Sequence, residues 1–332
     1  MKHALKDLLR TANLGPHDLS YLLDLAVEMK GRAHGYRKVL RDESVVLFFA
    51  KPSTRTFISF EAAIGRLGGQ PISVGPHELQ LGRGETIEDT ARVISGFARA
   101  FVIRTFSDEE VARFAAAASI PVINALTDGH HPCQSLADLL TLRERFGDLR
   151  GCRIAYVGDG TNVAHSLMEG AAILGMHMAV ATPPGHEPDP DVSSWARAEA
   201  EHRGGSLLLT HDAADAVSGA QAVYTDVWVS MGDPEEQRAA RVAALTPYRV
   251  DEALMARAAP DAVFLHCLPA HRGEEVTAAV IDGPQSAVFA QAANRLPTEQ
   301  AVLYALLEGK LGGRRGGPAA THEPRPLAGV AS

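Results

Sequence analysis

The stretch SVVLFFA at residues 44–50, followed by KPSTRTF at 51–57, gives the clearest indication of the fold of this chain. Its first part is a short apolar run, which is typical of a strand buried in a parallel sheet. Its second part leads into apolar residues at helical spacing (Phe60, Ile64, Leu67), and a Gly-Gly pair after them predicts the end of the helix. The stretch therefore predicts a strand–loop–helix unit.

The same alternation continues on both sides of this unit. Further strands are predicted at 100–104, 121–125, 153–157, 176–181, 206–210, 222–227 and 263–268. Helices are predicted near 19–27, 133–146, 163–174, 193–202, 251–258 and 298–308. Strands that alternate with helices predict parallel sheets covered on both faces. We therefore expect an α/β protein with two doubly wound domains, each with a mostly parallel sheet, linked by interdomain helices.

The length of 332 residues fits two domains, because a domain usually has roughly 100–200 residues. We expect a first domain at 1–140, completed by the C-terminal helix at about 298–310. The second domain is expected at 141–297. The tail at 311–332 is rich in Gly, Pro and charge, which predicts disorder.

The overall composition excludes several classes of protein. The formal net charge of −8 disfavours nucleic acid as a partner, since such proteins usually carry a basic excess. Three widely spaced cysteines (Cys133, Cys152 and Cys267) do not form a disulfide framework and fit a reducing, cytoplasmic location. The sequence shows neither a secretory signal nor an apolar run of the roughly 20 residues that a membrane span needs. We therefore expect a cytoplasmic protein without a membrane partner.

The segment Ser53-Thr54-Arg55-Thr56 lies between the first strand and its helix. The free N–H groups and the dipole of a helix N-terminus attract anions. The hydroxyls add further donors, and the Arg55 guanidinium matches phosphate oxygens. Taken alone, the segment fits a helix N-cap with a surface arginine equally well.

Three other positions carry polar groups at predicted strand ends or before predicted helices: Arg104, the His131–Gln134 segment and Arg295. Each alone has an ordinary explanation, such as a solvated arginine or a capping histidine. Ligands of open α/β sheets bind at the carboxyl ends of the strands. Together with Arg55, these residues are what a small, doubly charged substrate that carries a phosphate requires.

With these motifs together, the chain resembles the ornithine carbamoyltransferases from about residue 5 to 310. The matching segments follow the family's order: KPSTRT at 51–56, QLGRGETIEDTARV at 80–93, VIRTF at 102–106, PVINALTD at 121–128, HPCQSLADL at 131–139, YVGDGTNVAHSLM at 156–168, DVWVSMG at 226–232, HCLPAHRGEEVT at 266–277 and NRL at 294–296. STRT and HPCQ resemble the wider carbamoyltransferase group, whereas DVWVSMG and HCLPAHRG are more specific to the ornithine branch.

The resemblance implies that L-ornithine takes a carbamoyl group from carbamoyl phosphate to form L-citrulline, in arginine biosynthesis. The implied carbamoyl phosphate ligands are Ser53, Thr54, Arg55, Thr56, Gln80, Arg104, His131, Gln134, Cys267, Leu268 and Arg295. The implied ornithine ligands are Asn162, Asp226, Ser230 and Met231. Arg55, Arg104 and Cys267 are the implied catalytic residues. The resemblance also implies a homotrimer, or a multiple of trimers, in which Gln80 reaches the site of a neighbouring subunit.

The chemistry suits these residues without a metal or a cofactor. A neutral amine attacks the carbonyl carbon, and negative charge grows on the carbonyl oxygen and on the leaving phosphate, where fixed donors stabilise it. The His and Cys residues lack the spacing of zinc ligands. Asp226 alone favours the charged amine, so we interpret it as an orienting group. Cys267 is either a base or a small polar wall residue.

Two other classes of protein compete with this interpretation. Residues 158–163 (GDGTNV) resemble a dinucleotide-binding turn, but the third Gly is replaced by Val163 and the next strand ends without an acid, so a dehydrogenase is disfavoured. A binding protein that has lost catalysis is the other class, and the presence of Arg55, Arg104 and Arg295 disfavours it. Within the family, aspartate, putrescine, lysine and N-acetylornithine are alternative acceptors.

Four residues depart from the family's usual pattern. Phe57 stands in place of Arg, Ala293 in place of Glu, Pro297 in place of His and Thr161 in place of Asn. The joint loss of an Arg and a Glu indicates that the two pair in relatives and that an apolar contact replaced them here, a change that can be nearly neutral when buried. A phenylalanine that faces the phosphate would instead weaken carbamoyl phosphate binding.

Overall fold

The computed structural model describes residues 5–32, 35–80, 84–229 and 235–312. Its strands form two sheets in which every pairing is parallel. The first sheet has the order β2-β1-β3-β4, with β1 (Ser44–Phe49), β2 (Gln70–Val74), β3 (Ala100–Arg104) and β4 (Val122–Leu126). The second has the order β7-β6-β5-β8-β9, with β5 (Arg153–Val157), β6 (His177–Ala181), β7 (Ser206–Thr210), β8 (Ala222–Thr225) and β9 (Val263–His266). The predicted α/β class is confirmed.

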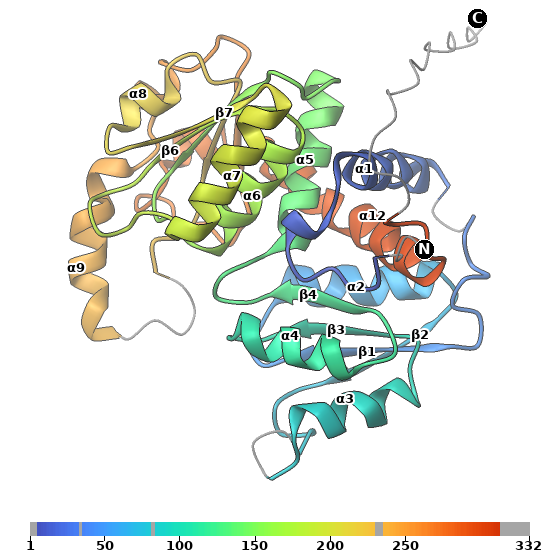
Figure 1. Cartoon of the computed structure of the whole chain (residues 1–332). Coiled ribbons are helices and arrows are strands. Elements are labelled where there is room, and N and C mark those ends of the chain that lie inside the picture. Colours follow the sequence, from blue (N-terminus) through green and yellow to red (C-terminus); the bar gives the residue numbers. More distant parts are fainter. Residues whose placement is uncertain (1–4, 33–34, 81–83, 230–234, 313–332) are drawn as a thin grey trace, which may run out of the picture.

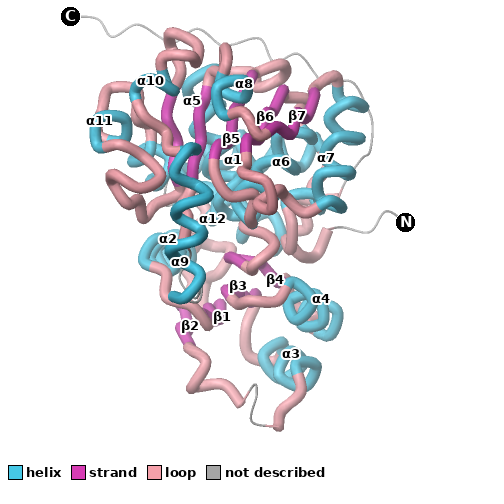
Figure 2. Tube along the Cα trace, turned by 90° about the vertical axis from the view of Figure 1, so that its left-hand side faces the viewer, coloured by secondary structure: helices cyan, strands magenta, loops and turns pink. Residues whose placement is uncertain are grey.

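Helices cover both faces of each sheet (Figures 1 and 2). The helices of the first half are α1 (Pro16–Gly31), α2 (Thr54–Arg66), α3 (Ile87–Ser95), α4 (Asp108–Ala117) and α5 (Pro132–Phe146). The remaining helices are α6 (Asn162–Ile173), α7 (Pro190–Arg203), α8 (Ala213–Val217), α9 (Glu235–Leu245), α10 (Glu252–Met255), α11 (Ala278–Ile281) and α12 (Val288–Leu307). Two 3₁₀ turns lie at Thr11–Asn13 (η1) and Thr246–Tyr248 (η2).

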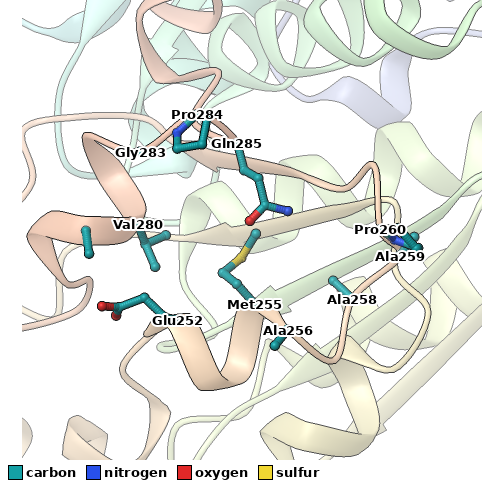
Figure 3. Close-up of a pocket in the computed structure, with 11 residues that line it drawn as sticks. Glu252, Met255, Ala256, Ala258, Ala259, Pro260, Val280, Gly283, Pro284 and Gln285 are labelled. Atoms are coloured by element: carbon teal, nitrogen blue, oxygen red, sulfur yellow. The ribbon is translucent and has the colours of Figure 1, made fainter.

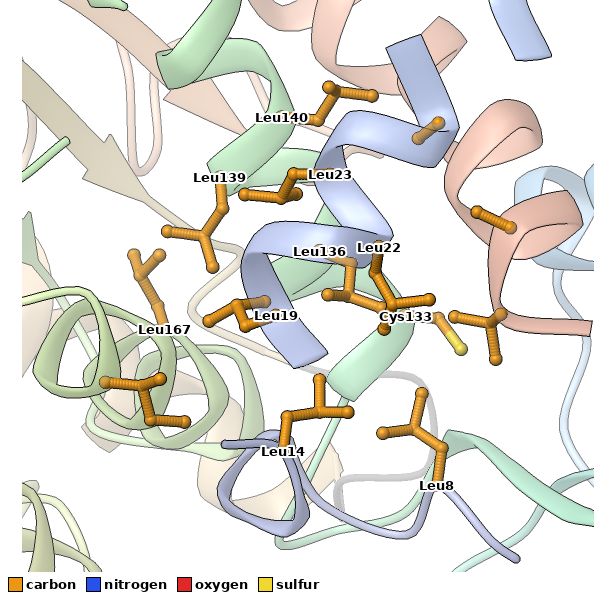
Figure 4. Close-up of a cluster of buried hydrophobic side chains, with 14 of the residues drawn as sticks. Leu8, Leu14, Leu19, Leu22, Leu23, Cys133, Leu136, Leu139, Leu140 and Leu167 are labelled. Atoms are coloured by element: carbon orange, nitrogen blue, oxygen red, sulfur yellow. The ribbon is translucent and has the colours of Figure 1, made fainter. Parts of the chain in front are cut away.

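One hydrophobic core joins the two sheets. Leu19 and Leu23 of α1, Leu136 and Leu139 of α5 and Leu167 of α6 belong to the same buried cluster (Figure 4). Burial of one such side chain is worth about 1.5–3 kcal/mol. Helices α1, α5 and α12 therefore form a packed layer between the sheets, and α12 also packs on α2 (Figure 1).

Most of the predicted elements are confirmed, with three strands at the predicted bounds: β3, β5 and β7. The prediction for the last helix is wrong, because α12 begins at Val288, ten residues before the expected start, and therefore contains Arg295 and Pro297. The proline does not end the helix, and the Thr298 hydroxyl donates to the Asn294 carbonyl beside it at 2.8 Å.

The sequence analysis missed β2, α3, α4, α8, α9 and α11. β2 is a half-exposed edge strand that contains Pro71, so it lacks the apolar run on which the other strands were recognised. α3 and α4 have the N-caps Thr86 and Ser107, whose hydroxyls accept backbone N–H groups. These caps are the signals that could have located both helices.

The end of the described chain is packed onto the core. Leu311 is buried, and its carbonyl accepts the Leu5 N–H at 3.1 Å. The rest of the tail for which disorder was predicted, residues 313–332, lies outside the described residues. Among the described residues, no helix has both the length and the apolar character to cross a membrane.

Candidate active site

The first part of the site forms where β1 and β3 end side by side. Phe49 and Arg104 are register partners, and the Ala50 N–H donates to the Arg104 carbonyl at 2.8 Å. The chain then enters α2 with Ser53 as N-cap, whose hydroxyl makes no capping hydrogen bond. The alternative interpretation as a simple Ser cap is therefore not realised. The free N–H groups at the start of α2 lie at the same sheet edge as Arg104, where they can bind an anion.

Arg104 and His131 are both buried with nitrogen atoms that lack partners. Arg104 Nε and His131 Nδ1 make no hydrogen bond to any described residue. Burial, together with the nearby Arg295 and Arg55 charges, lowers the pKa of Arg104 to about 10. Burial and the neighbouring guanidinium groups hold the pKa of His131 well below its usual range, so the ring is neutral at pH 7. Unpartnered buried nitrogens are rare, and these two fit hydrogen bonds to a bound anion.

Arg295 approaches from α12 and is held on three sides. Its guanidinium donates to Thr56 Oγ1 at 2.9 Å, to Gln134 Oε1 at 2.8 Å and to Glu299 Oε1 at 2.7 Å. Burial acts to lower the pKa of Arg295, but Glu299, together with the nearby Cys133 and Asp138, raises it overall. The expectation that Arg295 precedes a helix is wrong, but the structure does bring it to Thr56 and Gln134.

The HCLP turn, residues 266–269, connects this cationic region to the second sheet. Arg55 donates to the carbonyl of Leu268, which has φ 59° and precedes a cis Leu268–Pro269 bond. The Leu268 N–H donates to His266 Nδ1 at 2.8 Å. Arg55 and Leu268, which are 213 positions apart in sequence, are therefore neighbours in the fold.

Cys267 and Asp226 form a hydrogen-bonded pair at the ends of β9 and β8. The Cys267 thiol donates to Asp226 Oδ1 at 2.8 Å, and the Val227 N–H donates to the same oxygen at 2.7 Å. Burial and the Asp226 carboxylate raise the pKa of the Cys267 thiol well above its usual range, although the residue is still partly accessible. The geometry therefore favours a neutral thiol over a thiolate base.

The remaining predicted site residues are Asn162, Gln80, Ser230 and Met231. Asn162 begins α6, and its Nδ2 donates to the Thr127 carbonyl at 2.7 Å. Gln80 is exposed between β2 and α3. Ser230 and Met231 lie outside the described residues.

The four departures from the family pattern have different surroundings. Phe57 packs edge-on against Phe49, with ring centroids 5.5 Å apart, and lines a cavity of about 490 Å³ together with Ser53 and Thr54. Ala293 is exposed, so the buried apolar contact expected between Phe57 and Ala293 is not found. Thr161 is the N-cap of α6, without a side-chain capping bond. Pro297 is buried inside α12.

One cluster of the site has the donor atoms of a metal centre. Side-chain donors of Asp226, His266 and Cys267 lie within 4.8 Å of one another. The thiol already donates to Asp226, and His266 Nδ1 already accepts the Leu268 N–H. His266 Nε2 makes no hydrogen bond to any described residue and lies 3.3 Å from Glu275 Oε1. A metal ion would need to break the hydrogen bond from the thiol to Asp226, because it requires a thiolate.

A second cavity, of about 240 Å³, lies away from these residues and has a different lining. Figure 3 shows Met255 and Val280 beside Glu252, with alanines and prolines around them. Its lining contains no cationic side chain, and the Glu252 carboxylate accepts the Thr277 hydroxyl at 2.8 Å. This cavity is not suited to an anionic substrate.

Sequence reasoning missed three buried residues that support the site: Asp138, Gln291 and Glu299. Asp138 lies one helical turn after Gln134, within the HPCQSLADL segment, and accepts the Gln134 amide at 2.7 Å. Its i, i+4 spacing to Gln134 is a signal that could have found it. Gln291 and Glu299 lie in the part of α12 that flanks Arg295, and neither carries a sequence signal of its own.

Comparison with known proteins shows similarity along most of the chain. The family model described as "Aspartate/ornithine carbamoyltransferase, carbamoyl-P binding domain" matches residues 6–144, and the model of the Asp/Orn binding domain matches residues 150–306. The chain is 51% identical to an ornithine carbamoyltransferase of Carboxydothermus hydrogenoformans over 304 residues, which are 91% of this chain and 97% of the relative. It is 48% identical to that of Bacillus subtilis over 302 residues, 91% of this chain and 94% of the relative.

Among solved structures, the ornithine carbamoyltransferase from Pyrococcus furiosus superposes with a TM-score of 0.88 at 44% identity, covering 95% of this chain and 100% of that chain. The chain belongs to the aspartate/ornithine carbamoyltransferase family. It is accordingly a carbamoyltransferase, with two parallel-sheet units of the family's kind.

Proposed function

We propose that the chain transfers the carbamoyl group of carbamoyl phosphate to the side-chain amine of L-ornithine, giving L-citrulline and phosphate in arginine biosynthesis. The observation that carries the proposal is the convergence of Arg55, Arg104 and Arg295 with a neutral His131 at the start of α2. The curated relatives named as ornithine carbamoyltransferases, at about 50% identity, support the choice of ornithine.

In this proposal the cationic groups bind carbamoyl phosphate and stabilise its reaction. Ser53, Thr54 and Thr56 at the start of α2, with Arg55 and Arg104, bind the phosphate, assisted by Arg295 and Gln134. His131, as a neutral ring, donates one hydrogen bond to the carbonyl oxygen. Donors fixed in this way stabilise the charge that grows on the carbonyl oxygen and on the leaving phosphate.

The acceptor enters from the side of the second sheet. Asn162, Asp226, Ser230 and Met231 bind ornithine, and the Leu268 carbonyl and the Cys267 thiol lie beside the reacting groups. Because the thiol donates to Asp226 and its pKa is raised, we propose Cys267 as a polar wall residue and not as the base. The reactive form of ornithine is then its neutral amine. Carbamoyl phosphate binds first, since its phosphate occupies the inner part of the site.

We also propose the assembly, location and domain division expected from the sequence. A homotrimer is supported by the exposure of Gln80, which then serves the site of a neighbouring subunit. Three free thiols suit a reducing cytoplasm. A boundary near residue 140, with residues 298–310 completing the first domain, is supported by the packing of α12 on α2.

The test is a product assay with the purified full chain and carbamoyl phosphate. Separate reactions receive ornithine, aspartate, putrescine, lysine or N-acetylornithine, and both phosphate and carbamoylated product are counted. Citrulline from ornithine alone, abolished in Arg55→Ala, is the expected result. Product from another amine would show that the proposed roles of Asn162, Asp226 and Ser230 in binding ornithine are wrong. No product from any acceptor would make the inactive binding protein the better interpretation.

A further inference from the structure

A buried glutamine on α12, Gln291, lies between the two halves of the site. It is fully buried, and each end of its side-chain amide is occupied by a different partner. Its Oε1 accepts the backbone N–H of His266, the last residue of β9, at 2.9 Å. Its Nε2 donates to Asp138 Oδ1 on α5 at 2.6 Å and lies 3.1 Å from the Tyr224 hydroxyl.

These partners fix the direction of the amide. His266 presents a donor and Asp138 an acceptor, so a flipped amide would place donor against donor at one end and acceptor against acceptor at the other. Burial raises the pKa of Asp138 to about 7, while its hydrogen bonds from Gln291 and Gln134 act against this rise. At pH 8 the carboxylate is therefore mostly charged and accepts both amides.

Asp138 connects this junction to the carbamoyl phosphate half of the site. Asp138 Oδ1 also accepts the Gln134 amide at 2.7 Å, and Gln134 Oε1 accepts Arg295 at 2.8 Å. Arg295 in turn donates to Thr56 at the start of α2. A continuous chain of buried hydrogen bonds therefore runs from the start of α2 to Gln291.

The other end of the chain reaches the acceptor half. The His266 N–H that Gln291 accepts belongs to the residue directly before Cys267 and Leu268. The His266 ring accepts the Leu268 N–H, so the backbone and the ring of His266 together set the position of the HCLP turn. A shift of α5 relative to β9 must break one of these buried bonds.

We propose that Gln291 is a positioning residue that couples the carbamoyl phosphate half-site to the HCLP turn, so that carbamoyl phosphate bound at Arg295 and Gln134 favours binding of the acceptor beside Cys267 and Leu268. This inference rests on the proposed function, because it takes the HCLP turn as the place where acceptor and donor meet. Gln291 itself touches neither substrate in this account.

The test replaces the amide by the isosteric carboxylate. Gln291→Glu keeps the acceptor for the His266 N–H but sets a carboxylate against Asp138. Adding Asp138→Asn removes the repulsion between the two carboxylates. Because one oxygen of Asp138 accepts both Gln134 and Gln291, the asparagine can satisfy only one of these two contacts. The double variant therefore separates the effect of charge repulsion from the loss of the hydrogen-bond chain.

The matched control is Asn294→Asp, on the same helix and equally buried. Its amide donates to Thr141 and Glu144 and does not contact the HCLP turn in the described structure. This variant also places a new carboxylate against an existing one, so it reports the general cost of such a change. We expect it to lower the melting temperature and to leave turnover unchanged.

The readouts at pH 8 are citrulline turnover and the affinity for L-norvaline, which has the headgroup and carbon chain of ornithine but no nucleophile. Norvaline affinity is measured by calorimetry with and without carbamoyl phosphate, and the ratio is the coupling. In Gln291→Glu we expect turnover to fall about 100-fold, since a small misplacement can have this effect. We expect the coupling to fall about tenfold, within the usual range of coupling between sites. Affinity for carbamoyl phosphate alone should change less than about threefold.

The double variant should regain stability, but its coupling should stay about tenfold below that of the unmodified chain, because one contact of the hydrogen-bond chain remains broken. A folded Gln291→Glu variant with unchanged turnover and coupling overturns the proposal, as does a double variant that recovers both in full. An unmodified chain that makes no citrulline refutes the proposed function instead. The two failures are therefore distinguished by the unmodified chain.

Discussion

The two halves of the site differ in charge and in how firmly their residues are held. The carbamoyl phosphate half gathers three guanidinium groups on α2, β3 and α12, and their mutual repulsion contributes to the lowered pKa of Arg104. The acceptor half offers one carboxylate, Asp226, which already accepts a thiol and a backbone N–H. A dianion relieves the repulsion among the three guanidinium groups of the first half, whereas the Asp226 carboxylate of the second half is held by hydrogen bonds from neutral groups. From this difference we infer that the free protein binds the phosphate first.

Arg104→Ala is the sharpest test of this contrast. Loss of one fixed donor to the developing charge should lower kcat by about 10²–10³-fold, measured as citrulline formed. Because a ligand that binds only the folded state raises its stability, phosphate should raise the melting temperature of the unmodified chain more than that of the variant. Arg99→Ala, an exposed arginine one residue before β3, serves as the control. If phosphate raised the melting temperatures of Arg104→Ala and Arg99→Ala equally, Arg104 would not belong to the anion site.

A cluster of opposite charges lies beside His131, between the two halves of the site. His130 Nδ1 lies 2.7 Å from Asp108 Oδ1 on α4, and its Nε2 lies 3.4 Å from Glu169 Oε1 on α6, which Arg10 also contacts. Burial alone would lower the pKa of His130, but the two carboxylates outweigh it and raise that pKa above 6.5. The same contacts lower the pKa of Asp108 below 3.8 and that of Glu169 below 4.5, against the effect of burial.

The signs of these pKa shifts define a pH window for stability. The His130 contribution is fully present below pH 6.5 and is lost as the pH rises through its raised pKa. The carboxylate contributions are present above pH 4.5 and are lost as the pH falls through their lowered pKa values. His130→Asn should therefore lower the free energy of unfolding by about 1.5–3 kcal/mol at pH 5.5, and by less at pH 8.5. Urea unfolding at the two pH values measures this difference, and the exposed His17→Asn serves as the control. An equal loss of unfolding free energy at the two pH values would contradict the prediction.

Cys267→Ala tests the acceptor half, with a smaller expected effect. The variant loses one hydrogen bond to Asp226, which is worth about 0.5–1.5 kcal/mol, or roughly 3–10-fold in kcat. The shape of the pH–rate profile between pH 6 and 9 should not change, because the raised pKa keeps the thiol protonated throughout. Cys152→Ala is the control for loss of a thiol elsewhere. If the unmodified enzyme shows a titration in this pH range and the variant lacks it, Cys267 acts as the base.

Phe57→Arg should have the smallest effect. The new charge would line the partly open cavity beside Ser53 and Thr54, where water screens it. Charge pairs in such surroundings are worth about 0–1 kcal/mol, so the KM for carbamoyl phosphate should fall by no more than about fivefold. Ile58→Arg, an exposed position on the same helix, measures the general effect of added charge. A larger fall would show that Phe57 faces the phosphate directly and that the departure weakened the site.

The amino-acid pattern alone predicted the two parallel sheets and the placement of Arg104 at a strand end, and it predicted a helix beside the Ser53–Thr56 segment, although α2 already begins at Thr54. These features are local, because hydrophobic period, turn residues and strand ends are properties of neighbouring residues. Three features became visible only in the folded chain: Arg295 lies inside a helix, Arg55 contacts Leu268, and Gln291 joins α5 to β9. Such contacts join residues far apart in the chain, and the packing of whole helices and sheets sets them, so no local pattern contains them.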